Sequence, residues 1–358
     1  MCMQKMREIS YSEAIREALD QSMKTDSSIF IIGEGVPDAY GVFGTTKGLK
    51  EKYGNDRVLD MPLSENALTG MCVGAAMLGS KPVIVHQRLD FGFIALDQIV
   101  NNAASWHYTF AGQSKIPVVM RFVIGRGWGN GPQHSQSSQA LYAHIPGLKV
   151  VMPTTPYDAK GLLIQSIQDN NPVIFIEHRW LHGIKSHVPS EPYTVPIGIP
   201  KVVREGNDIT IASTSYMTIE AIRAADNLKS IGISAEVIDI RTLKPLDTSQ
   251  IRESVRKTGR LLVMDTGWRT CGFAGEIVAD IAESCFNFMK DAPMRLTLPD
   301  IPTPTSYSLT KTYYPDYTDA IMLVAKSLGK QKEAERLISQ VKKPTHHDVP
   351  DTSFRGPF

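Results

Sequence analysis

The chain has 358 residues, 42% of them hydrophobic and 21% charged, which is enough material for two or three globular domains. Its 38 basic and 37 acidic side chains give a formal net charge of +1, which argues against nucleic-acid binding or a polybasic membrane surface. No apolar run approaches the roughly 18 residues of a membrane span, and residues 1–10 lack the apolar core of a signal peptide. We therefore expect a cytoplasmic protein that does not bind a membrane.

Cysteine and histidine patterns exclude two further classes. The chain has four cysteines, Cys2, Cys72, Cys271 and Cys285, and no Cys-x-x-Cys pair, so we expect neither a disulfide framework nor a zinc site. The nine histidines include no His-Glu-x-x-His, and His346–His347 lies in a polar tail. Cys72 and Cys285 fall in apolar helical patterns and are expected to be small buried hydrophobes.

Strands and helices alternate along the first half of the chain. Ser10 and Glu13 form a Ser-x-x-Glu capping box, which predicts a helix beginning there, and Ser64-Glu65 opens another helix rich in small residues. Short apolar runs predict buried strands over 29–33, 57–62, 82–86, 116–122, 149–152 and 172–176, with further helices over 93–107 and 157–168. This order is typical of a doubly wound α/β domain, whose site lies at the carboxyl ends of the strands.

The second half repeats this order after a proline-rich stretch. Strands are predicted over 209–212, 235–240, 261–265 and 295–298, and helices over 217–230, 247–257 and 273–285. We therefore predict an α/β protein with two doubly wound domains, 1–182 and 208–330, joined by a linker over 183–207. The charged tail, 331–358, is either disordered or an arm that lies on a partner subunit.

Three features carry candidate chemistry, and each also has an ordinary explanation. Residues 125–131 are glycine-rich but form neither Gly-x-Gly-x-x-Gly nor a phosphate-binding P-loop, so they could be a ligand loop or a plain connection. Glu65 lies where a helix N-terminus favours a carboxylate, and first-turn acids are commonly capping residues. His134 is either a proton-transfer group or a hydrogen-bonded loop histidine.

The order of several separated motifs is more specific than any one of them. These motifs are Ser64-Glu65, Val85-His86-Gln87-Arg88-Leu89-Asp90-Phe91, Asp97-Gln98, Gln133-His134-Ser135-Gln136, residues 146–153, residues 169–173 and residues 239–247. From about residue 7 to 328 the chain resembles the beta subunit of the thiamine-diphosphate-dependent decarboxylating component of 2-oxo acid dehydrogenase complexes. The resemblance implies an N-terminal pyrimidine-binding domain and a transketolase C-terminal-like domain.

The resemblance also implies roles for individual residues. In the family a glutamate at the position of Glu65 hydrogen-bonds the aminopyrimidine ring of the cofactor and favours the tautomer that removes the thiazolium proton. Phe91 lies where the family has an aromatic ring that stacks on the pyrimidine. Gln87 and Glu34 complete the expected cofactor-binding set, and His134 lies in the loop that faces the substrate.

A cation site is also implied by some family members. Oxygen atoms of Asp169, Asn171, Val118, Ser166 and Ile167 match a potassium site there, although plain loop capping is the alternative.

No Gly-Asp-Gly occurs in the chain, whereas thiamine-diphosphate enzymes bind Mg²⁺ and the diphosphate through that motif. We therefore expect an alpha subunit to supply Gly-Asp-Gly and the Mg²⁺ ligands in an α2β2 assembly, with a lipoyl acyltransferase core as a further expected partner.

His86 and Arg88 depart from the pattern of the relatives. Arg88 could pair with a substrate carboxylate or phosphate, or form a salt bridge under the sheet. We assign both residues to the substrate side of the site as a hypothesis, and the sequence does not name the 2-oxo acid.

The leading interpretation is thus a 2-oxo acid dehydrogenase beta subunit that is inactive alone and passes an acyl group to a lipoyl arm. The first alternative is a split transketolase or acyloin-forming synthase that transfers a two-carbon unit to an aldehyde. The second is a non-catalytic scaffold that has kept the fold.

Overall fold

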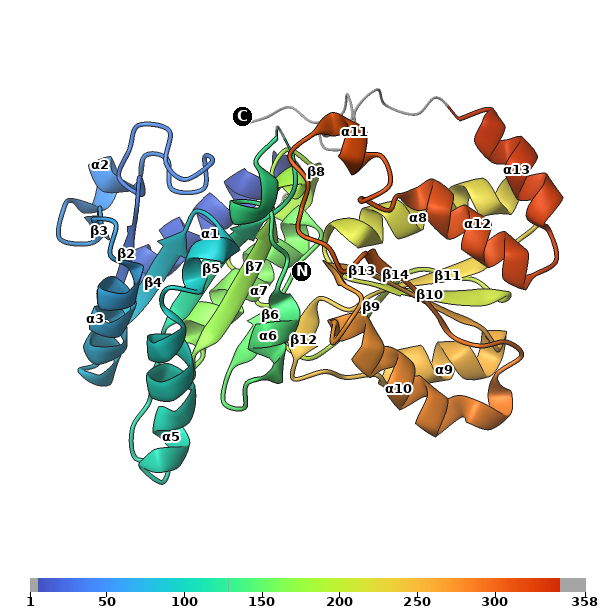
Figure 1. The fold of residues 1–358 in the computed structure, drawn as a ribbon. Helices are drawn as coiled ribbons and strands as arrows, with labels where there is room; N and C mark the ends of the chain where they lie inside the picture. The colour runs from blue at the N-terminus through green and yellow to red at the C-terminus, as the bar shows by residue number, and fades with distance from the viewer. Residues whose placement is uncertain (1–5, 128, 342–358) are drawn as a thin grey trace. The chain divides into compact units, whose positions relative to one another are not determined.

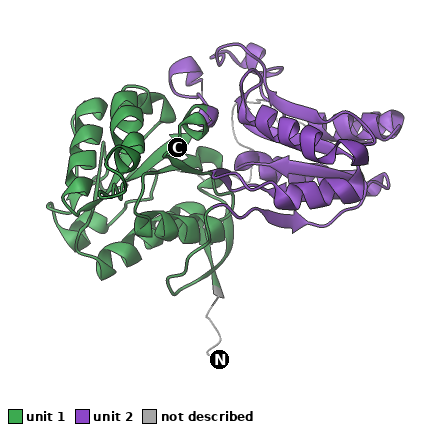
Figure 2. Ribbon diagram, turned by 90° about the horizontal axis from the view of Figure 1, so that it is seen from below, with its two compact units in different colours: residues 1–125, 141–197, 352–358 green, residues 126–140, 198–351 purple. Residues whose placement is uncertain are grey.

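The computed structural model describes residues 6–127 and 129–341, and these residues form two compact units (Figure 2). The first unit contains the described residues up to 125 together with 141–197, and the second contains 126–140 together with the described residues from 198 on. Cys2, the His346–His347 pair, the tail beyond 341 and Trp128 of the glycine-rich loop lie outside the described residues.

A parallel sheet with the strand order β6-β7-β5-β4-β2-β3 forms the centre of the first unit. Its strands are buried on both faces, as the short apolar runs of the sequence predict for a parallel sheet. The strands are β2 (Ile29–Gly33), β3 (Val58–Leu59), β4 (Lys81–His86), β5 (Val119–Ile124), β6 (Lys149–Val151) and β7 (Val173–His178).

Helices flank this sheet (Figure 1). Helix α1 packs against α7, whereas α3 packs against β4 and the π-helical segment η1. The predicted capping box begins α1, because the Glu13 amide donates to Ser10 Oγ at 3.2 Å and the Ser10 amide donates to Glu13 Oε2 at 2.7 Å. The helices are α1 (Tyr11–Thr25), α2 (Leu49–Tyr53), α3 (Glu65–Met77), α4 (Leu89–Gly92), η1 (Asp97–Ala104), α5 (Ser105–Thr109), α6 (Gln139–His144) and α7 (Pro156–Gln168).

The second unit has a sheet with the order β14-β13-β10-β11-β9, in which only the short β9 runs antiparallel to its neighbour among the described strands. The strands of this sheet are β9 (Lys201–Arg204), β10 (Ile209–Ser213), β11 (Ala235–Asp239), β13 (Leu261–Trp268) and β14 (Met294–Leu298). The unit also contains β12 (Thr242–Lys244), which is not part of this sheet. Its helices are α8 (Tyr216–Ser230), α9 (Ser249–Thr258), α10 (Phe273–Cys285), α11 (Tyr307–Thr310), α12 (Tyr317–Ser327) and α13 (Gln331–Ser339).

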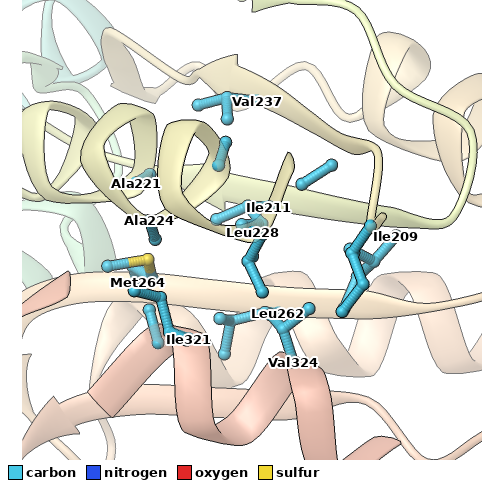
Figure 3. Close-up of a cluster of buried hydrophobic side chains, with 14 of the residues drawn as sticks. Ile209, Ile211, Ala221, Ala224, Leu228, Val237, Leu262, Met264, Ile321 and Val324 are labelled. Atoms are coloured by element: carbon cyan, nitrogen blue, oxygen red, sulfur yellow. The ribbon is translucent and has the colours of Figure 1, made fainter. Parts of the chain in front are cut away.

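An apolar core joins α8 and α12 to this sheet (Figure 3). Leu228 of α8 and Val324 of α12 meet Ile211 and Leu262, which come from neighbouring strands. Each of these side chains is fully buried, so each contributes on the order of 2 kcal/mol of hydrophobic stabilisation. The predicted α/β class with parallel-sheet domains is confirmed.

Three segments differ from what the sequence patterns predict. The helix expected over 93–107 is a π-helical segment followed by α5, because an apolar period over so few residues does not separate the two helix types. The stretch predicted as a linker contains β9 and also β8 (Lys185–Pro189), which pairs antiparallel with β1 (Met6–Ser10). Residues 126–140 group with the second unit, although they follow a strand of the first.

No helix of residues 6–127 or 129–341 is both long and apolar enough to cross a membrane.

Candidate active site

Glu65 is the first residue of α3 and is only 7% exposed. Ser64 precedes it without a side-chain capping bond, so the carboxylate lies at a helix N-terminus where amide N–H groups favour negative charge. The turn from β3 into α3 therefore buries an acid at the carboxyl edge of the sheet.

Glu34 lies in the same neighbourhood, directly after β2. Burial, followed by the nearby negative charges of Glu65 and Asp60, raises the pKa of Glu34 above its ordinary value. Its Oε1 is buried and has no hydrogen-bond partner among the described residues, whereas its backbone oxygen accepts from Gln87 Nε2 at 2.9 Å. The structure thus brings together three of the predicted cofactor residues.

The backbone between these residues is shaped by Gly35. Gly35 has φ +68°, its amide donates to Asp60 Oδ1 at 3.0 Å, and a Cβ there would lie 3.2 Å from Gln87 Nε2. Sequence reasoning did not single out Asp60, although its position at the end of a predicted strand was a usable signal.

Replacing Glu34 with Gln is expected to stabilise the cofactor-free protein at pH 7. The folded-state pKa is raised, so wild-type stability is fully present below the ordinary glutamate pKa and is lost as the pH rises through the folded value. Urea unfolding should show a larger free energy of unfolding for Glu34→Gln than for wild type at pH 7, and the difference should disappear below the ordinary glutamate pKa. Glu51→Gln, at an exposed residue of α2, should show no such difference. An unchanged stability at pH 7 would contradict this electrostatic account.

Phe91 lies in α4, the short helix that follows Gln87, and is half-buried. This position keeps an aromatic ring near the carboxyl end of β4. Its expected role in stacking on the cofactor stays a prediction.

His86 is 2% exposed and packs inside the protein. Its ring stacks on Phe122 with centroids 4.9 Å apart, and its Nε2 lies 3.5 Å from Thr69 Oγ1. Burial lowers the pKa of His86 to about 4, so the imidazole is neutral at physiological pH.

We expect His86 to make the protein acid-sensitive. Its folded-state pKa lies below the ordinary 6.5, so its stability contribution is present above pH 6.5 and is lost as the pH falls toward about 4. The wild type should lose on the order of 3 kcal/mol more than His86→Leu over that range. The free energy of unfolding is measured in urea between pH 7 and 4. His144→Leu, at an exposed histidine, is the control. The same pH dependence of this free energy in His86→Leu and wild type would refute the prediction.

Arg88 lies in a buried cationic cluster. The guanidinium carbons of Arg88 and Arg179 lie 5.8 and 3.7 Å from the centroid of the Phe43 ring, and both residues are at least nine-tenths buried. Burial and the charge of Arg88 lower the pKa of Arg179 to about 10. Burial also lowers the pKa of Arg88, and the charge of Asp90 opposes that change. Arg88 Nη1 has no hydrogen-bond partner among the described residues. Sequence reasoning found Arg88 but not Phe43 or Arg179.

A fully buried ion-pair network lies beside this cluster. Arg121 Nε donates to Glu177 Oε1 at 2.7 Å, and His182 Nε2 lies 3.2 Å from Glu177 Oε2. Arg121 Nη2 also donates to Thr45 Oγ1 at 3.0 Å, and the His182 ring centroid lies 5.9 Å from that of Phe43. No sequence pattern pairs Arg121 with Glu177 or Thr45, because these partners lie 56 and 76 positions away in the chain.

His134 belongs to the second unit and directly follows the 3₁₀ turn Gly131–Gln133. It is exposed. Its loop neighbours Gln133 and Gln136 line a pocket together with Trp268 and Ile301. The histidine therefore lies on a loop that faces a recess of the second unit.

The predicted potassium ligands lie at the end of α7. One Asp169 oxygen contacts the ammonium of Lys149, and the other accepts from the backbone amide of Asn171 at 2.9 Å. The carbonyl oxygens of Val118 and Ser166 accept amide hydrogens from Val173 and Asp169, and the place of Ile167 in such a site stays a prediction. No group of three or more His, Cys, Asp or Glu side chains within the described ranges is arranged as a metal site.

Comparison with known proteins identifies the family. The description "Transketolase, pyrimidine binding domain" matches residues 7–183, and "Transketolase, C-terminal domain" matches residues 198–319. The chain is 44% identical over 319 residues to the beta subunit of acetoin:2,6-dichlorophenolindophenol oxidoreductase from Cupriavidus necator, covering 86% of this chain and 94% of that one. It is 43% identical to the beta subunit of the pyruvate dehydrogenase E1 component from Gracilaria tenuistipitata, covering 86% and 95%.

The chain belongs to the pyruvate and acetoin dehydrogenase E1 beta-subunit family. A third member, from Rickettsia felis, is 40% identical over 89% of this chain and 98% of its own. A split-gene transketolase, described as an inactive beta4 tetramer, shares the fold of this E1 beta-type chain with a TM-score of 0.73 at 21% identity, covering 90% and 99%.

Proposed function

We propose that this chain is the beta subunit of a heteromeric, thiamine-diphosphate-dependent 2-oxo acid dehydrogenase and provides the pyrimidine half of its site. The observation that carries this proposal is the group formed by buried Glu65 and half-buried Glu34 and Gln87 at the carboxyl edge of the sheet, in a chain of the E1 beta-subunit family. Two neighbouring carboxylates in one partly buried place cost stability, which is typical of a functional site.

The residues of this group suit an aminopyrimidine. Glu65 would hold a proton against the ring nitrogen, Phe91 would stack on the ring, and Gln87 and Glu34 would line it. The buried Glu34 Oε1 that lacks a partner among the described residues is an acceptor suited to the exocyclic amine. When bound, thiamine diphosphate supplies a carbon nucleophile for the keto carbon of a 2-oxo acid.

We assign the diphosphate half to a partner. The chain contains no Gly-Asp-Gly, so an alpha subunit that carries this motif would bind Mg²⁺ and the diphosphate in an α2β2 assembly. A lipoyl acyltransferase core would accept the acyl group, His134 would face the substrate, and a cytoplasmic location stays a prediction.

Potassium at the end of α7 is part of the proposal. The ion would have to share the oxygens of Asp169 with Lys149 and Asn171, so we expect weak binding. The free energy of unfolding should be about 1.4 kcal/mol larger in KCl than in NaCl once the potassium concentration reaches ten times its Kd. Asp169→Asn should remove the difference, and identical unfolding of the wild type in the two salts would rule the site out.

One observation favours a second function. The buried guanidinium groups of Arg88 and Arg179 suit an anionic substrate such as a sugar phosphate, as a split transketolase or acyloin-forming synthase would use. In that case Arg88 would bind the substrate anion and His86, which is neutral and stacked on Phe122, would support its strand.

Acceptor dependence separates these functions. The tagged chain, purified with its partner, is assayed with pyruvate and other 2-oxo acids, with either lipoamide or an aldehyde as the acceptor. We expect carbon dioxide release that depends on lipoamide or on an artificial oxidant. Turnover only with aldehydes would favour the alternative, and Arg88→Gln should then raise KM for phosphorylated aldehydes more than for neutral ones.

A further inference from the structure

The loop that carries His134 is fastened to the second unit by a buried hydrogen-bond group. Gln139 Nε2 donates to Asp265 Oδ1 at 2.7 Å, and Ser137 Oγ lies 2.8 Å from Thr266 Oγ1. Gln139 and Asp265 are 0% and 1% exposed, although they lie 126 positions apart in the chain. Asp265 comes from β13, so a strand of the transketolase C-terminal-like sheet contacts the loop directly.

The bonds at Gln139 and Asp265 lie in the interior, and those to Thr266 are partly buried. Ser137 Oγ also lies 2.8 Å from Gln139 Oε1, so both ends of the Gln139 amide are bonded. Thr214 Oγ1 donates to the same Asp265 oxygen at 3.2 Å. Burial raises the pKa of Asp265, and the hydrogen bonds from Gln139 and Thr214 oppose that rise. Removing either the Asp265 carboxylate or the Gln139 amide would cost free energy, because the remaining buried group would lose its hydrogen-bond partner.

The first half of the loop is also held by the second unit. The Arg126 guanidinium lies 4.3 Å from the centroid of the Tyr314 ring, and a Cβ on Gly131 would lie 2.5 Å from Thr305 Oγ1. Gly131 has φ +64°, so a residue with a side chain would be strained there as well as crowded. His134 thus lies between two anchored points.

We infer that Asp265, acting through Gln139, is a positioning residue that holds the His134 loop for the reaction. The inference rests on the proposed function for the role of His134, and it gives the C-terminal-like domain a part in the active site as well as in assembly. Loops that hold reacting groups need such support, because small displacements lower the rate strongly.

Exchanging the chemistry of the pair provides the test. Gln139→Glu places a second carboxylate against Asp265, and the two buried negative charges repel. In the double variant with Asp265→Asn the new amide donates to the new carboxylate, while the hydroxyl groups of Thr214, Ser137 and Thr266 adjust as donors or acceptors. Gln340→Glu, at an exposed glutamine of the same unit, is the matched control.

The variants are measured in the complex purified with the partner. For Gln139→Glu we expect kcat to fall at least tenfold while the Kd of thiamine diphosphate stays within twofold of wild type. The double variant should regain most of kcat, giving a coupling that only interacting residues show. Wild-type kcat in Gln139→Glu, or a double variant as slow as the single one, would overturn the inference.

A readout independent of turnover examines the loop itself. Trypsin should cleave after Arg126 faster in Gln139→Glu than in wild type, and the double variant should regain protection. Equal cleavage of Gln139→Glu and wild type would overturn the inference even if the proposed function holds. A wild-type complex that neither binds thiamine diphosphate nor turns over would instead refute the proposed function, with the trypsin result still testing whether Asp265 holds the loop.

Discussion

Glu65→Gln is expected to lower turnover of the assembled enzyme by at least about 100-fold, the range that loss of a positioned proton-transfer group gives. Glutamine keeps the size and shape of the side chain, but it replaces one carboxylate oxygen by an amide nitrogen and cannot exchange a proton with a ring nitrogen. Because glutamine fills the same buried space at the start of α3 as Glu65, the substitution should leave folding intact. The measurement is kcat of the purified complex, together with its thermal unfolding.

The matched control is Glu51→Gln, which changes an exposed glutamate of the same unit. It should turn over like wild type. Full activity of Glu65→Gln with cofactor bound would remove Glu65 from the mechanism and would revive the idea of a non-catalytic scaffold.

The largest expected effect on stability is at Arg121. Arg121→Met leaves Glu177 as an uncompensated charge in a fully buried place, which costs about 3–5 kcal/mol in the free energy of unfolding. Burial alone would raise the pKa of Glu177, and the Arg121 charge and the His182 hydrogen bond outweigh it, so the pKa is lowered. Urea unfolding at pH 7 measures the loss.

Two further variants separate a buried charge from lost packing. Arg121→Met combined with Glu177→Gln removes both charges and should recover a substantial part of the loss. Arg204→Gln breaks the solvent-exposed pair with Asp226 and should cost less than about 1 kcal/mol. A loss at Arg121 no larger than that at Arg204 would show that the buried network does not stabilise the first unit.

Local signals predict most of the elements in both units. The capping box at Ser10 and the apolar runs of β2, β4 and β7 are each recognisable from a few consecutive residues. Helix α3 begins at Glu65, as the sequence indicates. A buried parallel strand needs apolar side chains on both faces, so its pattern is short and continuous. The carboxyl edge of the sheet could therefore be predicted together with the residues that follow its strands.

Long-range partnerships could not be predicted in this way. Nothing near Arg121 in the sequence points to Glu177, and nothing near Gln139 points to Asp265, because such pairs form only when distant strands meet. The same reason explains why residues 126–140 follow β5 in the chain and yet belong with the second unit. The π-helical segment was missed because its polar bonds, such as Asn101 to Asp97 at 2.8 Å, are compatible with an α-helix as well.

The most direct measurement of the central claim is purification of the tagged chain from its own host, with mass analysis of the proteins that copurify and a count of bound thiamine diphosphate. The account predicts a stoichiometric partner that carries Gly-Asp-Gly and one cofactor for each pair of subunits. A chain that purifies without such a partner and without cofactor would contradict it.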